Sequence, residues 1–256
     1  MMINDPDRDW EQWGKTDPYY AVLADAKYHA DHLDESTLAE FFETGRAHIE
    51  RTFSVIHTHL DPGFRPATAL DFGCGVGRLL VPLASVCETV VGVDVSESML
   101  REAEANCRER GLSNVSLVKS DDRLANVRGT FDFIHSFLVF QHIPRRRGEA
   151  LFKRLVAHLN DGGVGAMHFV YLKKSSALRR FGYWARTSLP IANGLINLAQ
   201  GKAFGDPLMQ SNRYDLNVLL RILQEAGCSH VFVRVMPKAN LYGAMLFFQK
   251  QYGQAR

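Results

Sequence analysis

The stretch ALDFGCGVGR, from Ala69 to Arg78, is the sequence feature that most constrains the fold of this chain. A short and mostly apolar run, Thr68 to Phe72, leads into it and is typical of a buried parallel strand. Three alternating glycines follow, which allow positive φ and the close approach of a ligand to the backbone. Apolar residues at helical spacing from Val76 to Ser85 then predict a helix whose first amides would face an anionic group. The pattern therefore indicates a strand, a nucleotide-binding turn and a helix.

The position of the third glycine distinguishes two kinds of nucleotide-binding turn. A dinucleotide-binding turn has the pattern G-x-G-x-x-G and would need glycine at position 78, where this chain has Arg78. The pattern D-x-G-x-G-x-G instead resembles the first motif of the class I S-adenosylmethionine-dependent methyltransferases. That resemblance implies that the turn holds the methionine and ribose parts of S-adenosyl-L-methionine, and that Asp71 supports the amino group. A nicotinamide-dependent oxidoreductase is the alternative from another class.

Four further segments follow in the order of the same family, and the resemblance covers Ala67 to Tyr171. Val90–Leu100 contains Asp94, which lies 23 residues after Asp71, where an acid at the end of a second strand can reach ribose hydroxyls. Asn114–Asp122 resembles the third strand, and Thr130–Ile143 resembles the fourth motif. Leu159–Phe169 resembles the helix, double-glycine turn and fifth strand that follow.

The resemblance also implies roles for individual residues. Asp94 would accept hydrogen bonds from both ribose hydroxyls, Asp121 would lie beside the adenine amino group, and Asp122 would add a backbone contact. The predicted cofactor-binding residues are Asp71, Gly73, Cys74, Gly75, Gly77, Arg78, Asp94, Val95, Met99, Asp121, Asp122 and Ser136. The expected product is S-adenosyl-L-homocysteine.

The predicted fold is α/β, the Rossmann-like class I methyltransferase fold with a seven-stranded, mostly parallel sheet and a C-terminal antiparallel strand. Residues 1–62 are predicted as an N-terminal helical cap, with turns at Pro18 and Gly45. Residues 63–171 and 214–256 are predicted as the cofactor-binding core. The latter range contains a helix over Tyr214–Ala226 and two strands, Val231–Met236 and Ala244–Gln249.

Residues 172–213 are predicted as an insertion with its own helical structure, because connections in compact domains are usually much shorter. Three interpretations are open: a lid over the substrate, a dimer contact and an interfacial membrane helix. We favour a lid or a contact in a homodimer, because the basic residues gather at one end and Pro190 interrupts the apolar stripe.

Composition predicts a cytoplasmic enzyme of 256 residues with one substantial core. A net charge of +2 gives no field that would recruit nucleic acid, and no apolar run is long enough for stable membrane insertion. The four cysteines form no C-x-x-C pair, which favours reduced thiols. No carboxylate-rich metal site is evident, and the expected partner is a small-molecule acceptor.

His142, in the segment FQHIP, is the predicted catalytic residue, because a histidine near the end of the fourth strand can take a proton from an acceptor hydroxyl. A pocket wall or a packing residue is the alternative. His135 and His168 are predicted as satisfied core histidines, and Arg145–Arg147 as a solvated helix start. The candidate substrate residues are Trp13, Tyr19, Tyr20, Phe140, Gln141, Tyr183, Trp184, Arg213 and Tyr214.

The predicted function is therefore O-methylation of a small molecule, such as a saccharide or a secondary metabolite. N- or C-methylation stays open, although the segment SFLVFQ lacks the D/N-P-P-Y pattern of amide- and adenine-methylating relatives. A catalytically silent partner protein with the methyltransferase fold is a further alternative.

Overall fold

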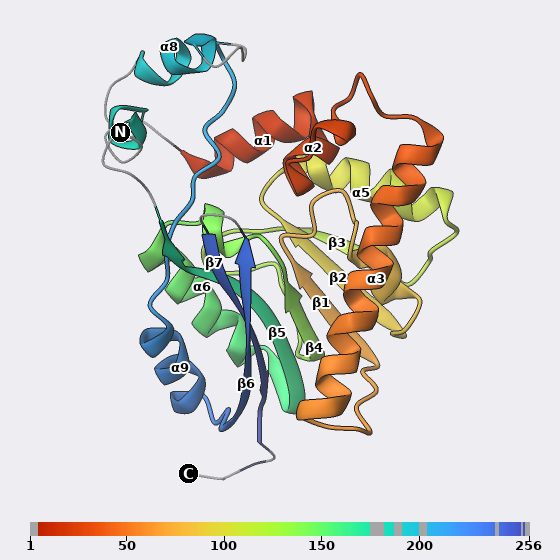
Figure 1. Ribbon diagram of the computed structural model, residues 1–256. Helices are drawn as coiled ribbons and strands as arrows, with labels where there is room; N and C mark the ends of the chain where they lie inside the picture. The colour runs from red at the N-terminus through yellow and green to blue at the C-terminus, as the bar shows by residue number, and fades with distance from the viewer. Residues whose placement is uncertain are drawn as a thin grey trace.

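The computed structural model describes residues 5–174, 182–186, 191–199, 204–238, 241–251 and 253. These residues form one seven-stranded sheet in the order β3-β2-β1-β4-β5-β7-β6, with helices on both faces (Figure 1). The predicted Rossmann-like fold with a mostly parallel sheet is confirmed. The division into cap, core and insertion stays a prediction.

The strands pair in parallel from β3 through β5, and β7 pairs antiparallel with both β5 and β6. The strand order reverses between β1 and β4, which is where ligands bind at the carboxyl edge of such sheets. The strands are β1 (Thr68–Phe72), β2 (Thr89–Asp94), β3 (Val115–Lys119), β4 (Phe131–Ser136), β5 (Leu159–Lys173), β6 (His230–Lys238) and β7 (Leu241–Gln249).

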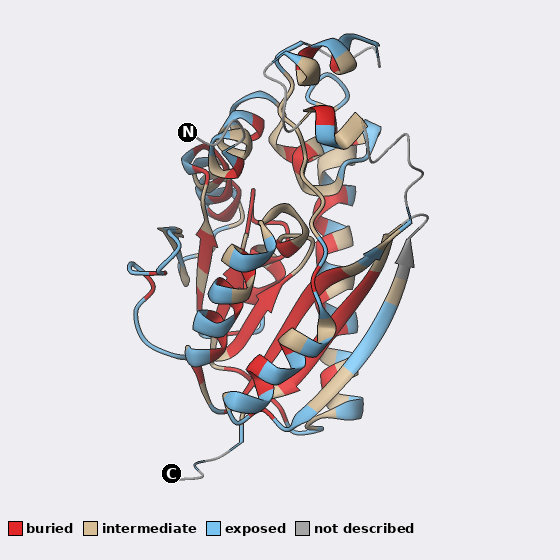
Figure 2. Ribbon diagram, turned by 90° about the vertical axis from the view of Figure 1, so that its left-hand side faces the viewer, coloured by how far each residue is buried: buried red, intermediate tan, exposed pale blue. Residues whose placement is uncertain are grey.

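Two helical layers bury the sheet, whose central strands are almost entirely buried (Figure 2). On one face, α6 (Arg145–Ala157) and α9 (Leu216–Glu225) pack against β1, β4, β5 and β7. On the other face, α3 (Glu35–His59), α4 (Leu80–Ala84) and α5 (Glu97–Glu109) pack against the same sheet. The two apolar clusters fix the sheet and so fix the carboxyl edge.

The N-terminal helices α1 (Pro6–Thr16) and α2 (Pro18–Leu23) lie at the carboxyl edge of the strands (Figure 1). A third apolar cluster joins them to α3 and α5. Asp17 ends α1 and Pro18 begins α2, so the turn predicted at Pro18 is confirmed. The remaining described elements are η1 (Ala26–Tyr28), η2 (Phe140–His142) and α8 (Ala192–Ala199).

The turn predicted at Gly45 is wrong, because Gly45 lies inside the continuous helix α3. A Cβ at this position would come within 2.1 Å of the Arg78 carbonyl oxygen, so glycine serves close packing here. The helix predicted over Val76–Ser85 is reduced to α4, which begins only at Leu80. The double glycine expected before the fifth strand lies within β5.

The described part of the insertion includes helical residues 182–186 and α8. The interruption predicted near Pro190 lies outside the described residues. Across the described residues, the search for a helix with the length and hydropathy of a membrane span finds none.

Candidate functional site

The glycine turn after β1 folds back onto the end of β2. The backbone N–H groups of Gly73 and Cys74 donate to the Val93 carbonyl at 2.7 and 3.1 Å. Gly73 and Gly75 have φ of 74° and 53°, which L side chains rarely adopt. A Cβ on Gly73 would also lie 2.3 Å from a Val139 methyl carbon. The turn therefore exposes backbone to a ligand only because its residues are glycines.

Asp94, the last residue of β2, holds this turn in place. Its Oδ2 accepts a hydrogen bond from Gly75 N–H at 2.9 Å, and its Oδ1 accepts one from Ser96 N–H at 2.9 Å. Removal from water raises the pKa of Asp94 to about 6, although these backbone hydrogen bonds favour the ionised form. Each oxygen keeps a free lone pair, so the carboxylate can accept two further hydrogen bonds.

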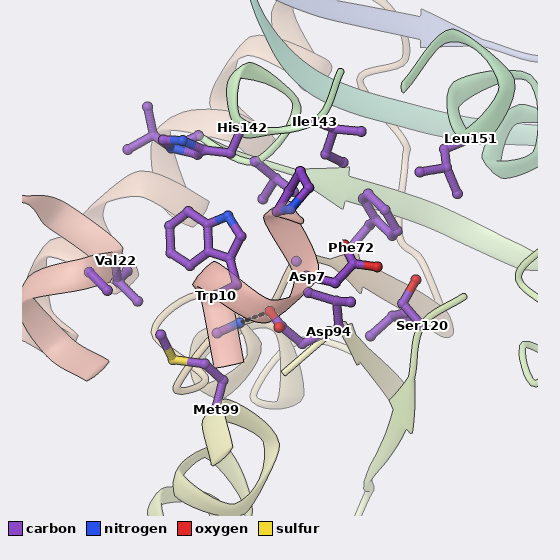
Figure 3. A pocket seen from close by; sticks show the side chains of 18 of the residues that line it. Asp7, Trp10, Val22, Phe72, Asp94, Met99, Ser120, His142, Ile143 and Leu151 are labelled. Carbon is purple, nitrogen blue, oxygen red and sulfur yellow. Dashed lines mark hydrogen bonds between the residues drawn. The ribbon is translucent and has the colours of Figure 1, made fainter. Parts of the chain in front are cut away.

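A cavity lies between α1 and the carboxyl ends of β1, β2 and β4, and Asp94 is part of its wall. Figure 3 shows the indole of Trp10 between Asp94 and His142. The ring centroids of Trp10 and His142 are 4.9 Å apart in an edge-to-face contact. The lining residues are Pro6, Asp7, Trp10, Ala21, Val22, Phe72, Gly73, Gly75, Val93, Asp94, Val95, Met99, Ser120, Phe137, Leu138, Val139, His142, Ile143, Arg147 and Leu151.

Arg147, near the start of α6, connects this helix to α1. Its Nη1 and Nη2 donate to the two carboxylate oxygens of Asp7 at 2.6 and 2.7 Å, and its Nε donates to Asp122. Such bidentate, charge-assisted pairs fix geometry as well as adding free energy. The solvated helix start predicted for Arg145–Arg147 is therefore wrong at Arg147, which faces the cavity and the first turn of α1.

Glu11 attaches the middle of α1 to the start of α5. Its carboxylate accepts hydrogen bonds from Ser96 Oγ at 2.8 Å, Ser98 Oγ at 2.8 Å and Ser98 N–H at 3.2 Å. Burial would raise the pKa of Glu11, but these donors and Lys15 together lower it to about 2. With Arg147, this contact holds α1 over the cavity at two points.

His142 lies across the cavity from Asp94, and both of its ring nitrogens are engaged. Nδ1 lies 2.7 Å from the Gln210 carbonyl oxygen, so it carries the proton, and Nε2 accepts a hydrogen bond from the Gln141 amide at 2.9 Å. Removal from water lowers the pKa of His142 to about 4. The imidazole is therefore neutral at pH 7.

Five of the predicted cofactor-binding residues line the cavity: Gly73, Gly75, Asp94, Val95 and Met99. Asp71 is buried and its Oδ1 lies 3.1 Å from His135 Nδ1, while Ser136 Oγ donates to the Phe72 carbonyl. Asp121 accepts hydrogen bonds from two backbone N–H groups of its own loop.

His142, the predicted catalytic residue, also lies on the wall of this cavity. Cys74, Gly77, Arg78 and Asp122 lie outside the lining, as Asp71, Asp121 and Ser136 do. Their predicted roles stay predictions.

The predicted substrate residues lie outside this cavity. Tyr214 is buried, and its hydroxyl lies within hydrogen-bond distance of the Phe140 and Ile143 carbonyls, so it supports the loop that carries His142. The Tyr19 hydroxyl donates to Glu102 at 2.6 Å. Trp13 and Phe140 are buried rings, and the Tyr20 ring stacks on His29. Gln141 is the amide partner of His142. Tyr183 and Trp184 belong to the helical residues 182–186, and Arg213 is exposed.

The two core histidines differ from each other. His135 is buried and bonded to Asp71 and to His48, as predicted. The prediction for His168 is wrong in one respect, because its buried Nδ1 has no hydrogen-bond partner among the described residues.

Sequence reasoning missed the part of the cavity that α1 and α6 supply, above all Asp7, Trp10 and Arg147. The acidic residues and tryptophan near the N-terminus were a weak signal, because nothing local shows which surface they cover. Among the described residues, no group of three His, Cys, Asp or Glu side chains is arranged to hold a metal ion.

Comparison with known proteins gives a consistent result. Residues 69–163 match the family model of a methyltransferase domain. The ubiquinone biosynthesis O-methyltransferase of Methylococcus capsulatus is 38% identical over 77 residues, which are 30% of this chain and 32% of that protein. The magnesium-protoporphyrin O-methyltransferase of Synechocystis is 34% identical over 88 residues, 34% of this chain and 38% of that protein. The chain thus matches about a third of the length of these relatives.

Among solved structures, the magnesium protoporphyrin IX methyltransferase of Synechocystis with bound SAH has a TM-score of 0.61. The match covers 95% of this chain and 98% of that chain at 18% sequence identity. At this identity the likeness shows the shared fold.

Proposed function

We propose that this chain is a class I S-adenosylmethionine-dependent methyltransferase that methylates a hydroxyl group of a small molecule, and the methyltransferase-domain match over residues 69–163 supports this proposal. The observation that carries the proposal is the Asp94 carboxylate, which is fixed by Gly75 and Ser96 while it lines the cavity. His142 lies on the opposite wall. A nucleoside held by Asp94 would thus extend toward a neutral imidazole.

The cavity wall fits S-adenosyl-L-methionine at two points. The Asp94 carboxylate can accept both hydroxyl protons of a ribose, and Gly73 and Gly75 present their backbone to the cavity with no side chain of their own to cover it. Met99 and Ser120 line the same cavity and would contact the adenine. When bound, the cofactor supplies an electrophilic methyl group on a sulfonium.

His142 has the protonation state that a general base needs. Its pKa of about 4 keeps the ring neutral at pH 7, so Nε2 carries a lone pair that can receive the proton of an acceptor hydroxyl. Gln141 would first have to give up its hydrogen bond to that nitrogen. The same low pKa makes the imidazole a weak base. It can therefore accept the hydroxyl proton only while the methyl group is being transferred, when that proton becomes acidic.

The Gln141 contact favours a second candidate function, methylation of an amine. A neutral amine already has a lone pair and needs no base, so His142 could remain bonded to Gln141 and act as a wall. The Trp10 ring beside His142 adds an aromatic face that would attract a cationic group.

The predicted cytoplasmic location and homodimer stay predictions.

Calorimetry and a methyl-transfer screen test the proposal together. We expect S-adenosyl-L-homocysteine to bind in the micromolar range and NAD not to bind; the reverse result would overturn the family-based proposal. A screen with tritiated S-adenosyl-L-methionine over alcohols, saccharides and amines then identifies the acceptor class.

His142→Gln separates the two candidates. For a hydroxyl acceptor we expect turnover to fall about a hundredfold with the cofactor affinity intact. His158→Gln, at a half-buried position outside the cavity, serves as the matched control. Unchanged turnover in His142→Gln would assign the residue to the cavity wall.

A further inference from the structure

A second cavity of about 440 Å³ lies on the α3 face of the sheet. Phe137, just after β4, lines both cavities, so the second begins where the first ends. The glycine turn lines only the first cavity. The second cavity is therefore placed for a molecule bound next to the cofactor.

Positive charge dominates the wall of this second cavity. Arg51, Arg78 and Arg234 line it with Lys27, against one acid, Asp25. Lys27 is paired with Glu40 at 2.6 Å. Within the described part of the chain, no ion pair neutralises the three arginines.

Arg78 is the most informative of these cations. Its residue is 4% exposed, its Nη1 donates only to Thr44 Oγ1 at 3.3 Å, and its Nε has no partner among the described residues. The nearby Asp71 is already bonded to His135. The buried Tyr28 hydroxyl, also on the cavity wall, lacks a partner as well. Buried charges and hydroxyls are normally paired, so an anion is the missing partner.

The rest of the wall is apolar. Met245 and Phe247 on β7 and Met236 on β6 line the cavity together with Phe137. These side chains would cover a hydrocarbon body that extends from the arginines toward the first cavity. The wall thus combines a cationic end with an apolar side.

We infer that the second cavity holds the methyl acceptor and that this acceptor carries a carboxylate or phosphate bound by Arg78 and Tyr28. Arg51 and Arg234 lie on α3 and on the edge strand β6, so they add charge on the side away from the glycine turn. The inference rests on the proposed function and names its substrate class: an acid with an apolar body.

Binding of decyl phosphate to the full-length chain tests this, with 1-decanol as the uncharged probe. We expect wild type to bind decyl phosphate at least tenfold more tightly than 1-decanol. Arg78→Gln, and separately the double variant Arg51→Gln/Arg234→Gln, should weaken decyl phosphate at least tenfold. Arg221→Gln, an exposed arginine on the opposite face, should leave it unchanged.

The affinity for S-adenosyl-L-homocysteine, measured in the same variants, distinguishes the acceptor from the cofactor as the source of the anion. We expect it to stay within twofold of wild type. If Arg78→Gln loses that affinity and keeps decyl phosphate binding, the guanidinium serves the cofactor and the inference is overturned. If Arg78→Gln does not fold, the double variant decides. Failure of S-adenosyl-L-homocysteine binding in wild type would instead defeat the proposed function, and with it the role of the bound acid as a methyl acceptor, while decyl phosphate binding would still show the anion site.

Discussion

Asp94 performs two tasks with one carboxylate. It ties the glycine turn to the end of β2 through Gly75 and Ser96, and it forms part of the cavity wall. Partial removal from water raises its pKa to about 6, so its ionisation falls within an accessible pH range. The charge on this residue can therefore be switched without mutating it.

We predict that the affinity for S-adenosyl-L-homocysteine falls as the pH is lowered from 7 to 5. The ionised carboxylate accepts two ribose hydroxyl protons, and protonation below a pKa of about 6 removes this capacity. Calorimetry across this range measures the effect.

Asp94→Asn is the control for that titration. It should bind about a hundredfold more weakly at pH 7, since hydrogen bonds to a charged group contribute about 1.5–3 kcal/mol each. Its affinity should then vary little with pH. An identical pH dependence in the variant would assign the titration to another group.

Gly45→Ala is predicted to destabilise the protein by about 2 kcal/mol, as overpacking does. At a solvent-exposed position inside a helix, the same change from glycine to alanine would stabilise the protein by up to about 1 kcal/mol. Here the new Cβ would lie 2.1 Å from the Arg78 carbonyl oxygen. Urea unfolding measures the difference, and Gly63→Ala, whose Cβ would meet only Asp61 Oδ1 at 3.4 Å, is the control. Equal stability of both variants would contradict the packing argument.

At the scale of elements, charged side chains attach α1 to the starts of α5 and α6. Asp7 in its first turn pairs with Arg147, and Glu11 one turn later binds Ser96 and Ser98. Asp7 and Arg147 line the cavity, so the position of α1 and the shape of the cavity depend on each other.

We predict that Arg147→Met loosens α1 and weakens S-adenosyl-L-homocysteine binding about tenfold. The substitution removes the bidentate pair with Asp7 while it keeps most of the apolar stem. Calorimetry measures the affinity, and limited proteolysis should show faster cleavage within α1. Arg146→Met, at an exposed neighbouring position, is the control. Unchanged affinity in Arg147→Met would show that α1 is held without this pair.

At the scale of the whole molecule, the cavity joins segments that are far apart in the sequence. Its wall includes α1, the glycine turn, the end of β2 and the loop after β4. A ligand that contacts all of them binds the native state alone and therefore stabilises it by mass action.

We predict that S-adenosyl-L-homocysteine at a hundred times its Kd stabilises the protein by about 2.7 kcal/mol. Hydrogen exchange should slow in α1 and in the glycine turn together, because both line the cavity. Thermal unfolding and exchange mass spectrometry measure the two effects. Stabilisation without protection of α1 would show that this helix does not cover the bound ligand.

The sequence allowed the strands along the chain and the glycine turn to be predicted, because these depend on patterns within a few residues. Apolar runs, positive-φ glycines and the acid at the end of β2 are local signals. Gly45 shows the limit of such signals: a glycine can mark a turn or a close helix contact, and only the neighbouring Arg78 carbonyl decides between them.

The sequence by itself determined the fold class and the acid that ends the second strand, Asp94, and it carries the resemblance to the methyltransferases. Only the tertiary structure decided that Asp7 meets Arg147, a partner 140 residues away, and that Arg78 belongs to a second cavity. The physical reason is range. Backbone conformation and apolar periodicity are set by near neighbours, whereas the partners of a side chain are set by how the helices pack on the sheet.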